Sequence, residues 1–236
     1  MSDAPVQYNL HEGIATIRID DGKRNALSPE VLRAIYEAFD RAESDKAAVV
    51  ITGRDDVFSA GFDLNVMKRG GSNAINMLRL GYGLTARVMS YPYPVVAACN
   101  GHVLAMGVFL MLSCDYTFGT RGDFRISANE VAIGMLMPRV AAMTLQNRLT
   151  PAAYQRAVTL AEYFDVESAH HAGFFDELVH ADDLMTQALS HTRELLKLNQ
   201  PAHKASKRRI RKKLVRRIRR SVPLDLFDAM LAGMRR

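Results

Sequence analysis

The sequence predicts an α/β fold on the strength of three observations. Its first twenty residues hold two alternating β-rich segments, VQYNL and IATIRI, separated by HEG. Two short apolar segments, AAVVITG and PVVAACNG, are each followed by a helical pattern, which gives the repeated order strand, turn, helix. From Thr150 onward the patterns are almost wholly helical. We therefore expect an α/β core followed by a C-terminal helical region.

The first elements are predicted from local signals. The two N-terminal segments form a β-hairpin in which Gly13 supplies the turn, because glycine tolerates the backbone angles that tight turns require. A helix follows, with Ser28 as its N-cap and Pro29 at its first helical position. The two apolar segments are strands that end at Gly53 and Gly101.

Four further elements are predicted after Thr150. TPAAYQRAVTLAEYF begins with a Thr-Pro helix start, and DVESAHHAG is a shorter helix that Gly173 ends. FFDELV is a strand, and ADDLMTQALSHTRELLKL is a longer amphipathic helix. Composition becomes basic near Pro201, so we divide the chain into a core, 1–195, and a basic helical region, 196–236.

Bulk composition favours a globular protein of a reducing compartment. Hydrophobic residues make up 48% of the 236 positions, which is enough to fill a core. The longest nearly uncharged run, 88–114, contains Asn100, Gly101 and His102, which argues against a membrane span. The first ten residues lack the pattern of a secretory signal, and two cysteines form no disulfide framework. We expect a cytoplasmic protein in which Cys99 and Cys114 are small core residues.

Two turns rich in small residues follow the two apolar strands. The first is Ser59-Ala60-Gly61, and the second is Ala105-Met106-Gly107 at the start of an apolar helix. Such turns leave backbone N–H groups without partners, and a helix start adds partial positive charge. Each turn alone is more simply explained as a plain loop. Together they could place two N–H groups on one carbonyl oxygen, which is the architecture of an oxyanion hole.

Several motifs, in order, resemble those of the crotonase (enoyl-CoA hydratase/isomerase) superfamily. They are KRNALS, VVITGRDDVFSAGFDL, PVVAACNGHVLAMG, ANEVAIGMLMP and AGFFDELV, and they span nearly the whole chain. The resemblance implies a crotonase-like spiral of ββα units with a C-terminal helical region. It also implies an acyl-CoA thioester as substrate, assembly into homotrimers or hexamers, no metal, and no cofactor beyond the CoA of the substrate.

The resemblance also assigns residues to the site. The oxyanion N–H groups fall on Phe62 and on Met106, a position that is usually glycine in the family. Arg24, Ala26 and Leu27 match the segment that lines pantetheine and adenine. The remaining substrate-binding positions are Ala60, Asp63, Leu64, Gly107 and Phe109.

Only one of the two glutamates expected in a hydratase of this family is present. One position maps to Phe109 and the other to Glu130. Hydration needs two groups to handle protons, whereas a double-bond shift needs only one base that removes and returns a proton. Phe109, the CDY after the helix and the Asn129-Glu130 pair resemble the Δ3,Δ2-enoyl-CoA isomerases. An apolar neighbour such as Phe109 is also expected to raise the pKa of Glu130.

Alternatives to this interpretation stay open. Without the family context, Glu130 is more simply a surface carboxylate. With it, the chain is an isomerase, a hydratase, or an acyl-CoA-binding protein that has lost catalysis. We expect His102 to be a pocket-wall residue and Asp115 to bind backbone at the end of the helix. Apolar residues around the acyl chain are expected at Met67, Met77, Leu78 and Leu80.

The basic segment between Lys204 and Arg220 holds eleven Lys and Arg residues and no acid, although the formal net charge of the whole chain is only +6. Ile210, Leu214 and Ile218 form an apolar stripe at helical spacing. The segment could be a packing helix with a solvated face, or it could pack on a neighbouring subunit while its cations reach the phosphates of CoA. It could also bind nucleic acid electrostatically or lie on an anionic membrane surface. No nucleic-acid motif accompanies it, so we do not expect nucleic-acid binding.

Overall fold

The computed structural model describes residues 4–234 and begins with the predicted hairpin. Strand β1 (Val6–His11) pairs antiparallel with β2 (Ile14–Ile19). Glu12 and Gly13 in the turn have positive φ values of 48° and 75°, which a two-residue hairpin turn requires. The role predicted for Gly13 is therefore confirmed.

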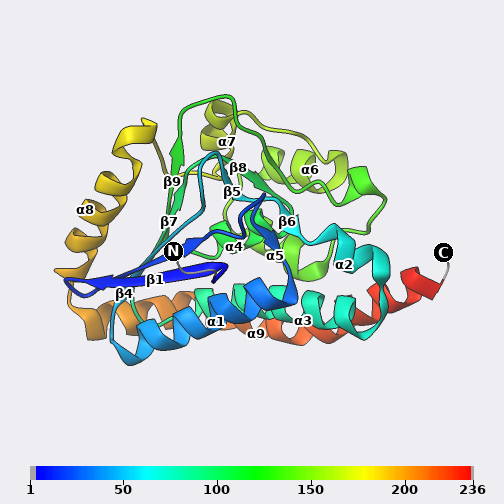
Figure 1. The fold of residues 1–236 in the computed structure, drawn as a ribbon, viewed down its shortest axis with the longest axis horizontal. Helices are drawn as coiled ribbons and strands as arrows, with labels where there is room; N and C mark the ends of the chain where they lie inside the picture. Colours follow the sequence, from blue (N-terminus) through cyan, green and yellow to red (C-terminus); the bar gives the residue numbers. More distant parts are fainter. Residues whose placement is uncertain (1–3, 235–236) are drawn as a thin grey trace.

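A six-stranded sheet forms the centre of the molecule (Figure 1). Its strand order is β1-β2-β4-β7-β9-β11, and every pair except β1-β2 is parallel. The apolar strands β4 and β7 are wholly buried, as expected for inner strands covered on both faces. The four strands not yet bounded are β4 (Ala48–Thr52), β7 (Val95–Cys99), β9 (Tyr116–Thr120) and β11 (Glu177–Val179).

A smaller parallel sheet lies beside the first and repeats its chain order. It has the order β10-β8-β5, formed by β5 (Val57–Ser59), β8 (His102–Leu104) and β10 (Ile126–Ser127). Each of these strands directly follows a strand of the large sheet: β5 follows β4, β8 follows β7, and β10 follows β9. Helical structure comes after each pair, so the chain repeats a ββα unit.

The helices predicted from start signals form as expected. The Ser28 hydroxyl accepts a hydrogen bond from the Val31 N–H and caps α1 (Pro29–Ser44). Two helices connect the first ββα unit to the second, α2 (Leu64–Arg69) and α3 (Gly71–Met89). The apolar helix α4 (Met106–Leu112) has every residue buried.

After β10 the structure differs from the prediction in two respects: one helix is shorter than predicted, and two elements were not predicted. Helix α6 (Pro151–Leu160) ends at Ala161 instead of reaching Phe164, because the Phe164 backbone exchanges two hydrogen bonds with Ile126. The 3-10 turn η1 (Val131–Ile133) and helix α5 (Arg139–Gln146) were not predicted. The elements up to the last helix are completed by α7 (Val166–Ala172), η2 (Ala181–Asp183) and α8 (Leu184–Leu196).

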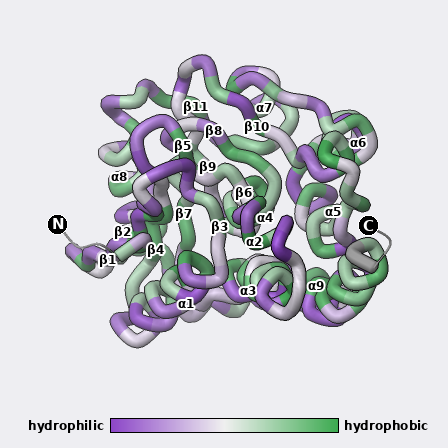
Figure 2. Tube along the Cα trace, turned by 45° about the vertical axis from the view of Figure 1, so that its right-hand side comes forward, coloured by the Kyte–Doolittle hydropathy of each residue, from purple (hydrophilic) through white to green (hydrophobic). Residues whose placement is uncertain are grey.

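The basic region forms one long helix, α9 (Gln200–Met234), which runs along the side of the molecule against α3 and α5 (Figure 1). The last two residues of the region predicted as 196–236 lie outside the described residues. Val215 and Ile218 join the main hydrophobic core. Figure 2 shows hydrophobic segments in the interior and hydrophilic ones mainly at the periphery. None of the helices within 4–234 is both long and apolar enough to cross a bilayer.

The predicted apolar stripe of the basic region is wrong at Ile210, which is 76% exposed. The buried face of α9 instead carries two cations, Lys207 and Arg211. The Lys207 Nζ lies 2.6 Å from Asp115 Oδ2, and an Arg211 guanidinium nitrogen lies 2.8 Å from Oδ1. These ion pairs turn the helix so that Ile210 faces outward.

Candidate active site

The first small-residue bend is held by a network of side chains from the preceding loop. Ser59 at the end of β5 donates its hydroxyl to the Asn25 carbonyl at 2.8 Å and accepts the Gly61 N–H at 3.1 Å. Gly61 has a φ of 87°, which turns the chain into the two-residue strand β6 (Gly61–Phe62). Strand β6 pairs with β3 (Ala26–Leu27), so the bend has a fixed conformation.

Asn25 organises this region and was missed by the sequence analysis. It is fully buried with a φ of 53°, and its amide donates to the carbonyls of Ile19, Val57 and Phe58 at 2.8–3.2 Å. Asparagine is one of the few residues that tolerates the left-handed region. An Asn directly before the Ala-Leu pair of KRNALS was the available signal.

The second bend begins α4 and presents unpaired backbone N–H groups. Ala105 precedes the helix with the strained angles φ 48° and ψ −121°. Within 4–234 the Met106 N–H donates to no protein acceptor, as expected at the first position of a helix whose N-cap supplies no side chain. A 2.8 Å hydrogen bond from the Ala105 N–H to the Ser127 carbonyl helps to hold Ala105 in this strained conformation.

The two bends lie in direct contact. A Cβ built on Gly61 would approach Ala105 Cβ to 2.7 Å and the Met106 nitrogen to 3.3 Å. A Cβ built on Gly107 would approach the Ser59 carbonyl to 2.8 Å. Both glycines are therefore needed for this packing, and the backbone of the first bend lies beside the Met106 N–H.

The Phe62 N–H is oriented by the pairing of β6 with β3. The Asp63 N–H donates to the Leu27 carbonyl at 3.5 Å and so faces β3. Since neighbouring N–H groups of an extended chain face opposite sides, the Phe62 N–H faces away from β3. The Phe62 and Met106 N–H groups are thus the two main-chain donors that the family resemblance expects in an oxyanion hole.

Glu130 lies after β10, at the start of η1, and is buried. Only 4% of its surface is exposed, which excludes the alternative of a solvated surface carboxylate. Burial raises the pKa of Glu130 to about 7, with a partial offset from its own backbone N–H. Among the described residues no group donates to its Oε2 oxygen. A buried carboxylate with one oxygen free of donors and a pKa near neutrality is suited to act as a base.

Apolar side chains fill the rest of this region. Met106 and Phe109 are both 0% exposed. Helix α3 passes so close that a Cβ on Gly81 would lie 2.3 Å from the Phe62 ring and 3.3 Å from the Met106 sulfur. The Met106 side chain therefore packs under α3 and is not an obstacle projecting from the bend.

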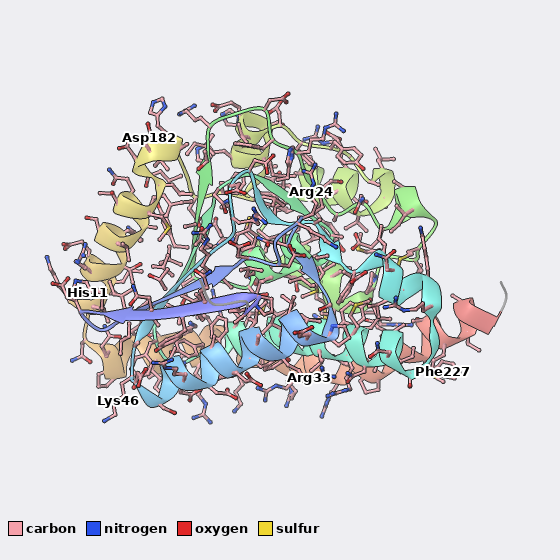
Figure 3. All side chains as sticks on the ribbon, in the orientation of Figure 1. His11, Arg24, Arg33, Lys46, Asp182 and Phe227 are labelled. Carbon is pink, nitrogen blue, oxygen red and sulfur yellow. The ribbon has the colours of Figure 1, made fainter. Side chains whose placement is uncertain are left out.

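The predicted substrate-binding residues surround the first bend. The Arg24 carbonyl accepts the Ala60 N–H at 3.1 Å, and the Arg24 side chain is exposed near the middle of the view in Figure 3. Asp63 is an N-cap: its Oδ1 accepts the N–H groups of Asn65 and Val66. Leu64 is 56% exposed. Of the residues proposed for the acyl chain, Met77 and Leu78 are fully buried and Met67 and Leu80 partly so.

Three other sequence-based expectations can be compared with the structure. Asp115 accepts the Val95 N–H at 2.8 Å, which confirms its expected bond to backbone. His102 is half-buried, accepts the Arg125 N–H and packs edge-on against Phe124, as expected for a wall residue. Cys99 and Cys114 are buried and free. No cluster of potential metal ligands occurs within residues 4–234.

The sequence is similar to those of known proteins. The model of the family described as enoyl-CoA hydratase/isomerase matches residues 9–227. A probable enoyl-CoA hydratase, EchA17 of Mycobacterium avium, is 31% identical over 189 residues, or 78% of this chain and 72% of that protein.

Two solved structures extend the likeness to the fold. An enoyl-CoA isomerase of Mycobacterium tuberculosis is 43% identical with a TM-score of 0.90, covering 95% of this chain and 98% of the other. The human mitochondrial Δ3,Δ2-enoyl-CoA isomerase is 26% identical with a TM-score of 0.91, covering 95% and 90%. These similarities confirm the expected spiral of ββα units.

Proposed function

Because this chain belongs to the enoyl-CoA hydratase/isomerase family, we propose that it is an enoyl-CoA isomerase in which Glu130 is the single acid/base. The family acts on acyl-CoA thioesters. The fold and the two bends described above supply the setting for that chemistry. CoA is part of the substrate in this proposal, and no further cofactor takes part.

The proposed reaction moves one proton and shifts two electron pairs. The thioester oxygen accepts hydrogen bonds from the Phe62 and Met106 N–H groups, which acidifies the α-carbon. Glu130 removes the α-proton, and the electrons of that C–H bond form the enolate that the two N–H groups stabilise. The enolate electrons then shift along the chain, the double bond moves from β,γ to α,β, and Glu130 returns the proton to the γ-carbon.

The observation that carries this proposal is that Glu130 is buried while the position expected to hold a second glutamate is the apolar Phe109. The carboxylate has a pKa of about 7, so near neutral pH it exists in comparable amounts as base and as acid. The position expected to carry a second glutamate holds a fully buried phenyl ring instead. One proton carrier suffices for a double-bond shift.

Hydration is the second candidate, because hydratase is the more frequent name among the curated relatives. Addition of water requires one group to take a proton from water and another to protonate the α-carbon. Glu130 would have to do both, which favours the isomerase proposal. Non-catalytic binding of acyl-CoA is the third candidate.

Purified protein and its Glu130→Gln variant separate these functions. We expect wild type to convert a 3-enoyl-CoA to the conjugated 2-enoyl-CoA, seen as a rise in thioester absorbance, with kcat about 10³-fold lower in the variant. Hydration of 2-enoyl-CoA without isomerisation would replace the proposal with the hydratase. Tight binding of acyl-CoA with neither reaction would leave only the binding function.

A further inference from the structure

An open cavity of about 400 Å³ lies between α5, α6 and α9, on the side of the molecule where Figure 2 shows these three helices together. Its volume is within the range of small-molecule binding sites. All of its lining residues belong to these helices, and none belongs to the two bends or to the segment of Glu130. The cavity is therefore built by elements other than those of the proposed active site.

The polar wall of this cavity consists mainly of hydrogen-bond donors. Arg217 and Arg220 both line it, and they lie three residues apart on α9. The other polar side chains in the wall are Arg139, Gln146, Tyr154 and Ser221. Guanidinium groups can only donate, and hydroxyl and amide groups can donate as well. The wall therefore suits a ligand that accepts several hydrogen bonds and carries negative charge.

The positive charge at this cavity is not neutralised by the part of the chain that the structure describes. Within 4–234 the side chains of Arg217 and Arg220 make no ion pair and no hydrogen bond. Like charges three residues apart on a helix repel each other. The two acids of α9, Asp225 and Asp228, both bind Arg139 instead. An anion in the cavity would face both free arginines and relieve their repulsion.

The chemistry of the wall favours a phosphoryl group joined to a carbon skeleton. Arginine binds phosphoryl oxygens in a bidentate manner, and a phosphoryl group carries up to two negative charges at neutral pH, whereas a carboxylate carries one. Two unpaired arginines are thus matched by one phosphoryl group. Ala142 and Met143 of α5 also line the cavity, and their apolar atoms suit the carbon skeleton of the ligand.

We propose that this cavity binds a small organic phosphate at a site separate from that of acyl-CoA, with Arg217 and Arg220 holding the phosphoryl group and Tyr154 and Ser221 as further donors. The proposal does not depend on the reaction assigned to Glu130. A ligand in this cavity contacts α5, α6 and α9 at once. Binding to the folded state is therefore expected to raise the midpoint of thermal unfolding.

The test is isothermal titration calorimetry with phenyl phosphate in about 0.15 M salt, where attraction between distant exposed charges is largely screened. We expect saturable binding, tighter than that of inorganic phosphate or of benzoate. The double variant Arg217→Gln/Arg220→Gln is expected to bind at least about tenfold more weakly, and Tyr154→Phe about threefold more weakly. No saturable binding of phenyl phosphate overturns the proposal, and equal binding of benzoate rejects the phosphoryl specificity.

The double variant Arg209→Gln/Arg216→Gln is the matched control. It removes the same charge from the same helix at two exposed positions that do not line the cavity. We expect its affinity for phenyl phosphate to stay within about twofold of wild type. Equal weakening in the two double variants would show diffuse attraction to the basic helix and overturn the proposal. Thermal unfolding without ligand checks that all variants are folded.

Competition with CoA identifies the source of the phosphoryl group, because CoA carries phosphoryl groups of its own. We expect phenyl phosphate to bind with unchanged affinity when CoA is present in excess. If CoA displaces phenyl phosphate, and this displacement requires Arg217 and Arg220, the cavity belongs to the acyl-CoA site and the proposal of a separate site is rejected.

Discussion

At the residue scale, the burial of Glu130 lowers the stability of the fold wherever the carboxylate is ionised. Its pKa is about 7 in the folded protein and near 4.5 when exposed, so the folded state binds more protons between these values. The contribution of this group to the free energy of unfolding is therefore fully present below pH 4.5 and lost as the pH rises through 7. A shift of this size corresponds to roughly 3 kcal/mol.

The first prediction follows from this sign. Glu130→Gln cannot titrate, so its free energy of unfolding is expected to exceed that of wild type by roughly 3 kcal/mol more at pH 8.5 than at pH 4.5. Urea unfolding of both proteins at the two pH values measures the difference. If the two free energies of unfolding differ by the same amount at both pH values, folding does not raise the pKa of Glu130.

The second prediction concerns Gly81, whose hydrogen faces the Phe62 ring. In Gly81→Ala the new Cβ would lie within 2.3–2.5 Å of two ring carbons, so the ring and the bend that carries it must move. We expect kcat/KM for the isomerisation to fall at least tenfold, because small displacements of the groups around the reacting atoms are costly. Steady-state kinetics measure the loss.

Gly83→Ala provides the comparison on the same helix. Its Cβ would meet the hydroxyl of Tyr36 at 2.9 Å and nothing of the first bend. We expect activity to stay within about threefold of wild type, a loss well below that of Gly81→Ala. Equal losses in the two variants would show that α3 as a whole, and not the contact with Phe62, controls the site.

At the scale of elements, a buried carboxylate of helix α9 joins this helix to the start of α5. Asp225 is 5% exposed and caps α5 from another helix: its oxygens accept the N–H groups of Arg139 at 3.0 Å and Val140 at 2.9 Å. Helix α5 begins a few residues after Glu130 and η1. The C-terminal helix thus stabilises the start of α5, which follows Glu130 closely in the chain.

The third prediction concerns the hydrogen bonds from the start of α5 to Asp225. Asp225→Ala leaves two helix-terminal N–H groups and the Arg139 guanidinium without their buried acceptor, so we expect a loss of about 2–4 kcal/mol in the free energy of unfolding. Asp228→Ala is the matched control, because Asp228 pairs only with Arg139 and is more exposed. Its loss is expected to be below about 1 kcal/mol. Equal losses by urea unfolding would contradict a capping role.

Some cations of helix α9 face the protein interior, and others face solvent. Lys207 and Arg211 bind Asp115, and these contacts hold α9 against the loop after α4. Lys207 is buried, and burial lowers its pKa against the opposing influence of Asp115. Other cations of the segment, including Arg208, Lys212 and Lys213, are exposed. This arrangement is explained by a helix that packs on the protein with one face and exposes its other cations to solvent.

At the scale of the whole molecule, some apolar side chains remain on the surface, on α6, on α9 and in the segment before α5. Leu136 is 76% exposed, Leu160 69% and Phe227 59%, the last labelled toward the end of α9 in Figure 3. Single exposed apolar residues are normal on protein surfaces, so the expectation of a partner at these positions comes from the family resemblance.

The fourth prediction is that these surfaces meet other copies of the chain, as the family resemblance implies. We propose a homotrimer or hexamer and expect sedimentation equilibrium to give a mass three or six times the 26.3 kDa of one chain. Leu136→Glu is expected to lower that mass if Leu136 lies between copies. A stable monomer at micromolar concentration would reject the assembly.

The sequence by itself determined the elements whose signals are local. Ser28 and Pro29 begin a helix, Gly13 permits a hairpin turn and buried apolar runs form inner strands, because each depends on the conformational preferences of a few neighbouring residues. Helix α5 and η1 lacked such signals and were missed. The motif order, in turn, was enough to place Phe62, Met106 and Glu130 as candidates.

Only the tertiary structure decided how those candidates meet. Contact between Gly61 and Met106, the burial of Glu130 and the packing of α3 against Phe62 depend on segments distant in the chain. Likewise, Asp115 decides which face of α9 is buried, so Ile210 is exposed despite its helical spacing. Burial and electrostatic pairing are properties of surroundings that the whole fold assembles, and no local pattern specifies them.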